Sequence, residues 1–247
     1  MTCERFPGCA EPSSAAMSWA APGGKPADPG SEPNPEPRVK PRFRGMSHLL
    51  AACIATPAAV FLWFGATSWA ARWGAAIYGL SLVLLLATSA VYHRPTWGLR
   101  ARDLLGRLDQ SAIFLLIAGT YTPFGLLLGA GTGHLLLALV WGGALGGVAL
   151  SLLWPTAPKP VMAGIYVAFG WSFALLVPSL FHAAGVVVIG LIVAGALAYT
   201  VGALIYALRR PDPFPRTFGY HEVFHLLVVV AAVCHFAAVS LTLPALG

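Results

Sequence analysis

Seven apolar segments follow one another from Met46 to the end of the chain. They cover residues 46–66, 73–93, 108–129, 133–154, 160–181, 184–208 and 220–243. Each is close to the roughly 20 residues that a helix needs to cross the hydrocarbon core of a bilayer. The connections between them are short, and a lipid-facing backbone must satisfy its own hydrogen bonds, so only helices fit. The pattern predicts an all-α fold, an integral membrane seven-transmembrane helix bundle over residues 46–244.

The chain before the first apolar segment has a different composition. Residues 1–45 are rich in Pro, Gly, Ser and Glu, as in the stretch PADPGSEPNPEPRVKPRFR. Such a stretch buries too little apolar surface to offset the entropy of folding, so we expect a disordered tail. It also lacks the basic start and continuous apolar core of a secretory signal. The sequence leaves open whether the chain begins at Met1 or near Met46.

Lys and Arg are concentrated in every second connection between the apolar segments. They are frequent before the first apolar segment and after the second, fourth and sixth, whereas the other side has Arg72 alone. Positively charged connections stay in the cytoplasm. We therefore expect a cytoplasmic N-terminus, so that residues 1–45 form a cytoplasmic tail, and a C-terminus outside.

Composition supports the membrane class and excludes others. The chain is 57% hydrophobic and only 10% charged, whereas soluble domains carry about a quarter charged residues. The net charge of +6 follows the membrane topology, so it gives no reason to expect a nucleic-acid partner. Four cysteines have no CxxC spacing and indicate neither a redox motif nor a disulfide framework. We expect a multi-pass protein of the cell membrane.

Five polar residues of the apolar segments share one depth in this topology. Ser89 and His93 end the second segment, Asp109 lies in the first turn of the third, and His221 and His225 begin the seventh. All are predicted near the inner membrane surface. Ionisable groups are costly there unless they are paired or bind a metal.

The spacing of these residues indicates a metal site. His221 and His225 are four residues apart and so lie on one face of a helix, about 6 Å apart along it. A third imidazole, His93, would complete a three-histidine site. Zinc suits three neutral nitrogen ligands with a fourth position open to water, which is typical of catalytic zinc. We therefore predict Zn²⁺ as the cofactor.

The remaining four histidines are interpreted as residues that do not bind the metal. His48, His134 and His182 are interpreted as amphipathic side chains at the membrane surface or in loops. His235 lies ten residues past His225, about 15 Å further along the helix, which is too far to share the metal. We expect it to face the bundle interior and to make a buried hydrogen bond.

Three motifs together resemble the hemolysin III family, the bacterial branch of the progestin and adiponectin receptor family, whose relatives include alkaline ceramidases. They are SAVYH at 89–93, LDQSAIFLLIAGTYTPF at 108–124 and HEVFHLLVVVAAVCHF at 221–236. The resemblance implies a seven-helix bundle with zinc near the cytoplasmic face. It implies that His93, His221 and His225 are the ligands. It also implies that Asp109 lies near the water at the metal and that Ser89 is a hydrogen-bonding partner.

The preferred hypothesis is a zinc-dependent hydrolase that cleaves an amide or ester bond of a lipid. Zinc would activate water and polarise the substrate carbonyl, with Asp109 and Ser89 as the catalytic residues. The substrate, a membrane lipid, would enter from the inner leaflet, because the site lies at that depth.

Three alternatives remain. HEVFH at 221–225 matches the HExxH motif of metalloproteases, in which Glu222 would be the general base. A non-enzymatic lipid or metal sensor would use zinc only to hold helix ends together. A membrane-damaging hemolysin is less well supported, because a single polar cluster offers no charged path across the bilayer. The role of Glu222 stays open.

Overall fold

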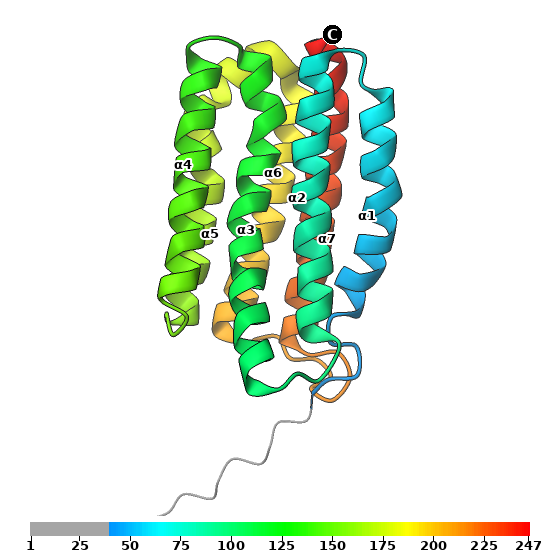
Figure 1. The fold of residues 1–247 in the computed structure, drawn as a ribbon, viewed down its shortest axis with the longest axis vertical. Coiled ribbons are helices and arrows are strands. Elements are labelled where there is room, and N and C mark those ends of the chain that lie inside the picture. The colour runs from blue at the N-terminus through cyan, green and yellow to red at the C-terminus, as the bar shows by residue number, and fades with distance from the viewer. Residues whose placement is uncertain (1–39) are drawn as a thin grey trace, which may run out of the picture. The chain divides into compact units, whose positions relative to one another are not determined.

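The computed structural model describes residues 40–247, which are all-helical and contain no strand in that range (Figure 1). The tail predicted for residues 1–45 lies outside this range except for its last residues. The α-helices are α1 (Met46–Gly65), α2 (Trp69–His93), α3 (Leu99–Leu128), α4 (Thr132–Leu153), α5 (Lys159–Trp171), α6 (Val177–Leu208) and α7 (Tyr220–Thr242). Two short 3₁₀ helices, η1 (Ser172–Leu176) and η2 (Leu243–Leu246), follow α5 and α7.

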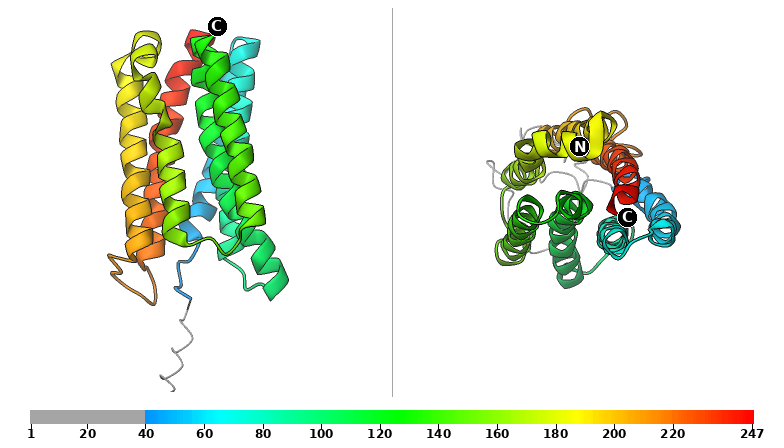
Figure 2. Two further views of the ribbon diagram at one scale, coloured as in Figure 1. Left: turned by 90° about the vertical axis from the view of Figure 1, so that its left-hand side faces the viewer. Right: turned by 90° about the horizontal axis from the view of Figure 1, so that it is seen from above.

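Six helical stretches of the described residues are long and apolar enough to cross a membrane. The expected segments 160–181 and 184–208 fall in one of these, a run of 50 residues from Lys159 to Leu208. In this run α5, η1 and α6 follow one another without a loop, and Gly185 is the one residue of α6 with a non-helical backbone, at φ 81° and ψ 171°. Figures 1 and 2 show α5 and most of α6 side by side, so the run turns back on itself.

One local expectation is corrected. Helix α3 begins at Leu99, nine residues before the apolar segment, so Asp109 lies in its third turn rather than its first. A helix whose end projects into water needs no apolar side chains there, and hydropathy therefore missed these turns.

The helices pack mainly against their neighbours in sequence, through small residues at several crossings. Helix α3 contacts α2 and α4, α1 contacts α2, and α6 contacts α7. A Cβ atom added to Gly147 would collide with the Phe114 ring, and one added to Gly79 would lie 2.7 Å from the Ala59 Cβ. These contacts use the close approach that small residues allow in membrane helices.

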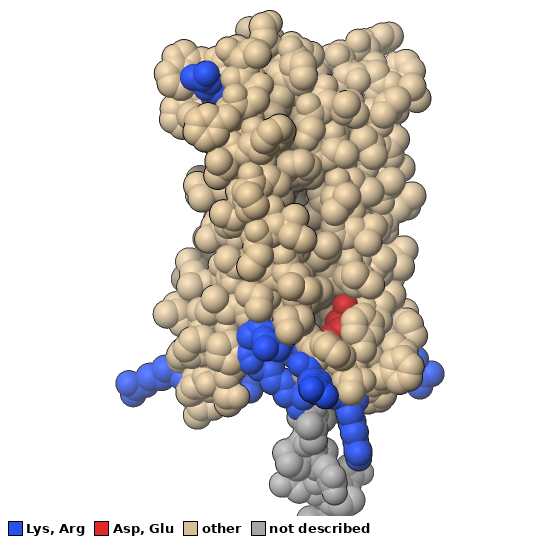
Figure 3. Space-filling model, turned by 90° about the vertical axis from the view of Figure 1, so that its right-hand side faces the viewer, with Lys and Arg blue, Asp and Glu red and all other residues tan. Residues whose placement is uncertain are grey.

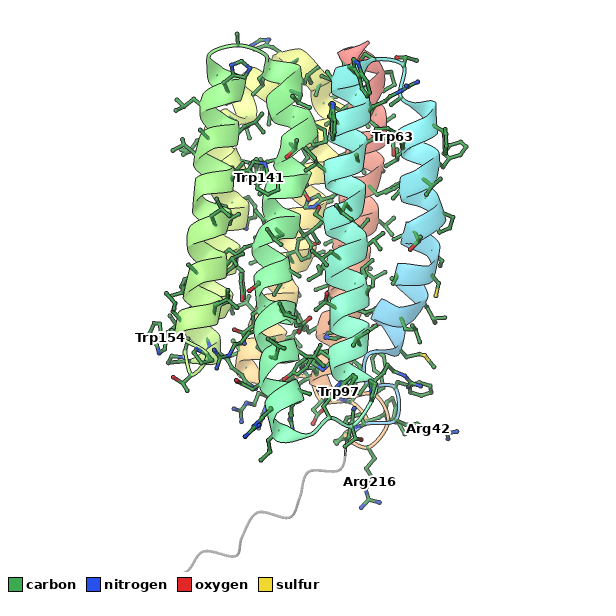
Figure 4. All side chains as sticks on the ribbon, viewed as in Figure 1. Arg42, Trp63, Trp97, Trp141, Trp154 and Arg216 are labelled. Atoms are coloured by element: carbon green, nitrogen blue, oxygen red, sulfur yellow. The ribbon has the colours of Figure 1, made fainter. Side chains whose placement is uncertain are left out.

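Basic side chains gather at one end of the bundle. This basic end holds the start of α1, the end of α2 and the start of α7 (Figures 1 and 3). Arg42, Trp97 and Arg216 mark it in Figure 4. Arg72, at the start of α2, is the one Lys or Arg of residues 40–247 near the opposite end. The charge asymmetry expected from the sequence is therefore present in the folded bundle.

Candidate metal centre

Three imidazole rings meet at the basic end. His93 ends α2, whereas His221 and His225 occupy the first two turns of α7. Each offers a ring nitrogen, and these three nitrogens all lie within 4.8 Å of one another. The ring centroids are 4.5–4.9 Å apart. His221 and His225 are buried, with 8% and 2% of their surface exposed, so their close approach takes place away from bulk solvent.

The separations fit one small ion. Zinc binds histidine nitrogen at about 2.0–2.1 Å with tetrahedral geometry, which puts two ligand nitrogens about 3.3–3.4 Å apart. The Nε2 atoms of His93 and His221 are 3.3 Å apart. The nitrogen that His225 offers lies within 4.8 Å of both. Within residues 40–247 this is the single cluster of three His, Cys, Asp or Glu side chains with such a spacing.

Helix ends hold these rings in place. Helix α2 ends at His93, and the chain cannot continue it past Pro95, because proline has no backbone N–H to donate to the preceding turn. The Lys40 ammonium donates hydrogen bonds to the carbonyl oxygens of Arg94 (2.9 Å) and Pro95 (3.0 Å), which caps this end. Gly45 lies against the ligand itself, since an added Cβ would be 2.8 Å from the His93 Cβ. Gly45 has φ 73° and ψ 4°, a left-handed conformation that favours glycine.

Of the other two predicted site residues, Asp109 joins the cluster. Its Oδ2 lies 3.6 Å from the His93 Nε2, the same nitrogen that faces His221. The carboxylate is therefore on the side of His93 where a metal would bind. Ser89 is buried one helical turn before His93, so the two side chains share a face of α2. The roles predicted for these two residues stay predictions.

Glu222 has other partners. Its Oε2 accepts a hydrogen bond from the Gly219 backbone N–H (2.8 Å), which caps the first turn of α7. Its Oε1 lies 2.6 Å from the Arg44 Nε in an ion pair, and Glu222 is only 3% exposed. Both carboxylate oxygens are thus engaged away from the three rings. This geometry gives Glu222 a structural role. It does not favour the HExxH protease hypothesis, in which Glu222 would be the general base.

Sequence reasoning missed His48. The interpretation as a surface side chain is wrong, because His48 is buried (3% exposed) and its ring stacks on that of His225, with centroids 3.9 Å apart and planes 8° from parallel. The topology does indicate this position. The first and seventh spans start on the same side of the membrane, so His48 lies at the same depth as His221 and His225.

The three remaining histidines lie outside the cluster. His134 and His182 are exposed, as expected for side chains without a buried role. The His235 Nε2 lies 3.2 Å from the Ile192 carbonyl oxygen, which confirms the predicted buried hydrogen bond.

Comparison with known proteins shows the family to which the chain belongs. Residues 37–236, which include every residue of the cluster, match the family described as Haemolysin-III related. The chain belongs to this family. It is 32% identical over 200 residues to the hemolysin-3 homolog of Bacillus subtilis, covering 78% of this chain and 90% of the relative. It is 30% identical over 204 residues to hemolysin-3 of Bacillus cereus, covering 81% and 90% of the two chains.

The family extends to eukaryotic receptors. The chain is 30% identical over 156 residues to the adiponectin receptor protein of Drosophila melanogaster, covering 56% of this chain and 35% of the relative. These relatives and the apolar helices identify a multi-pass membrane protein of the hemolysin III type. Its three histidines can hold a metal ion.

Proposed function

We propose that this hemolysin III protein crosses the membrane seven times, with its basic end in the cytoplasm. The 50-residue run from Lys159 to Leu208 is too long for one crossing of about 20 residues and turns back on itself, so it supplies two. Together with the other five stretches this makes seven. The concentration of Lys and Arg at one end supports a cytoplasmic N-terminus and an external C-terminus.

The proposed activity is zinc-dependent hydrolysis of an amide or ester bond of a membrane lipid. The observation that carries it is the convergence of His93, His221 and His225 at nitrogen separations that suit zinc, with one carboxylate beside them. Three neutral nitrogen ligands leave the fourth position that catalytic zinc sites keep open. Zinc bound there supplies a Lewis acid for a carbonyl oxygen and lowers the pKa of water.

The protein's own groups complete the reaction. Asp109 orients a water molecule and removes its proton as the water oxygen attacks the carbonyl carbon. The same carboxyl returns the proton to the amine or alcohol that leaves when the C–N or C–O bond breaks. Ser89 donates a hydrogen bond within the site. The cluster lies at the cytoplasmic end of the bundle, so the lipid enters from the inner leaflet.

The position of Asp109 also favours a second candidate, a sensor with structural zinc. A carboxylate oxygen 3.6 Å from the His93 Nε2 is close enough to become a fourth ligand after a small movement. Four protein ligands make a closed zinc site that stabilises structure and has no position for a substrate.

One experiment separates these candidates. Zinc is measured in purified wild type, Asp109→Asn and His225→Ala, and each is assayed against a panel of lipid amides and esters. The hydrolase requires one zinc in wild type and Asp109→Asn, turnover in wild type alone, and loss of zinc in His225→Ala. Zinc that is lost in Asp109→Asn, with no turnover in wild type, supports the sensor. Wild type without zinc refutes both.

A further inference from the structure

His48 has an unmet hydrogen-bonding requirement. It is the third residue of α1 and is buried, yet neither of its ring nitrogens has a hydrogen-bond partner among residues 40–247. Buried polar side-chain atoms nearly always have a partner, either in the protein or in a bound molecule. A neutral imidazole has one donor and one acceptor to satisfy. The partner of His48 is therefore expected to be a group that the chain itself does not supply.

The position of His48 indicates where that group lies. Its ring covers the face of the His225 ring at 3.9 Å, and His225 in turn lies 4.9 Å from His93 and 4.5 Å from His221, measured between centroids. Four imidazoles from three helices thus form one cluster. His48 therefore lies beside the candidate metal centre, in contact with one of its proposed ligands.

The stacked geometry excludes His48 as a further ligand of the same ion. An imidazole nitrogen binds metal through a lone pair in the plane of its ring. The planes of His48 and His225 are 8° from parallel and lie one above the other. An ion in the plane of His225 is therefore out of the plane of His48. A group held beside the ion, one ring layer away, falls in the plane of His48 instead.

We propose that His48 contacts the substrate: it hydrogen-bonds the polar group of a lipid held beside the metal, while its ring face fixes the orientation of His225. This inference rests on the proposed metal centre and adds a residue to it from α1. His48 fixes the orientation of His225 through packing, because a flat ring at 3.9 Å restricts rotation of the ring that it covers.

Two probes separate hydrogen bonding from metal binding. Decanehydroxamic acid binds zinc through its two oxygens and carries polar N–H and oxygen atoms that a neighbouring side chain can hydrogen-bond, whereas decanethiol binds zinc through sulfur, a weak hydrogen-bonding atom. Their affinities are measured by calorimetry on the full-length, zinc-loaded protein in detergent. The variants are His48→Phe, which keeps a stacked ring without nitrogens, and His48→Gln, which restores a donor and an acceptor. His235→Phe is the matched control, since His235 is also a largely buried histidine but has its own backbone acceptor.

The expected pattern is specific. His48→Phe weakens hydroxamate binding about ten-fold, the effect of one lost hydrogen bond, and changes thiol binding less than two-fold. His48→Gln recovers part of the loss, and His235→Phe changes neither affinity. Zinc stays at one per chain in all of them, which shows that the variants fold.

Other results overturn the inference. Wild-type hydroxamate affinity in His48→Phe means that His48 contacts no bound group. Equal loss of both probes together with zinc means that His48 acts on the metal alone. Wild type that binds zinc and both probes but cleaves no lipid refutes the proposed hydrolase, whereas the binding data still decide the role of His48. Wild type without zinc refutes the hydrolase and this inference together.

Discussion

Replacing Gly45 by alanine should weaken zinc binding from outside the ligand set. The new Cβ would lie 2.8 Å from the His93 Cβ, well inside the contact distance of two carbon atoms. No side-chain rotation relieves this contact, because both atoms are fixed to the backbone. Either the 40–45 segment or the end of α2 must move, and His93 moves with it. Gly45 also has φ 73°, where a non-glycine residue costs about 1–2 kcal/mol.

These two effects have different readouts. The backbone strain lowers the stability of the folded protein by about 1–2 kcal/mol with or without zinc. Displacement of a ligand acts on the metal alone, and changes next to ligands typically weaken metal affinity 10–100-fold. We therefore expect Gly45→Ala to bind zinc at least ten-fold more weakly than wild type. Zinc affinity is measured by competition with a chromogenic chelator, and stability by thermal unfolding of the metal-free protein.

Gly129→Ala is the control. Gly129 also has a positive φ, 68°, but an added Cβ would meet nothing within 4 Å, and the residue follows α3 at the opposite end of the bundle. With ψ −154° it lies in a region that almost only glycine adopts, so alanine there is strained at least as much as at Gly45, but it meets no collision. Loss of stability in both variants, with wild-type zinc affinity in Gly45→Ala, would show that His93 does not depend on Gly45.

Two further substitutions test other parts of the structure. Glu222→Gln removes the ion pair with the partly exposed Arg44, so we expect thermal unfolding to show a loss of about 1–3 kcal/mol, with zinc content and turnover unchanged. Loss of turnover without loss of stability would instead support the HExxH base. Gly147→Val overpacks the Phe114 ring and should cost about 1–3 kcal/mol, whereas Gly146→Val, which points into open space, should be neutral. Equal unfolding temperatures for these two valine variants would refute the packing.

The cluster of His93, His221 and His225 could be predicted because a membrane removes most alternatives. Apolar segments define helices, their alternating direction assigns each polar residue to one side, and a four-residue spacing puts two histidines on one face. Three separate segments then agree on one depth. The structure brings the three rings together as this reasoning required.

What hydropathy could not predict are features that depend on backbone conformation and pairing. The run from α5 to α6 has no polar loop, so its turn rests on η1 and the positive φ of Gly185. The first turns of α3 are polar and resemble a loop in composition. The ion pair between Arg44 and Glu222 joins residues 178 positions apart, and nothing in either local pattern indicates the partner.

His48 was missed for a different reason. A single histidine near a membrane surface is usually amphipathic, and that general expectation outweighed its depth. The same argument from depth that grouped the other histidines applies to His48 equally. The shared membrane depth of polar residues is thus a more informative indicator of a site than spacing within one helix. It also identifies a site residue such as His48, which has no histidine four positions away.

The short segment from Lys40 to His48 is as much a part of the candidate site as α2 and α7 are. Gly45 lies against His93, Arg44 pairs with Glu222 next to His221, and His48 stacks on His225. Each proposed ligand or its neighbour therefore has one contact from this segment. The Arg42 and Phe43 backbone N–H groups also donate to Arg216 and Thr217, in the connection that leads into α7. Since these contacts join the start of α1 to both ligand-bearing helices, a movement of residues 40–45 relative to α2 and α7 is expected to shift the imidazoles that they contact.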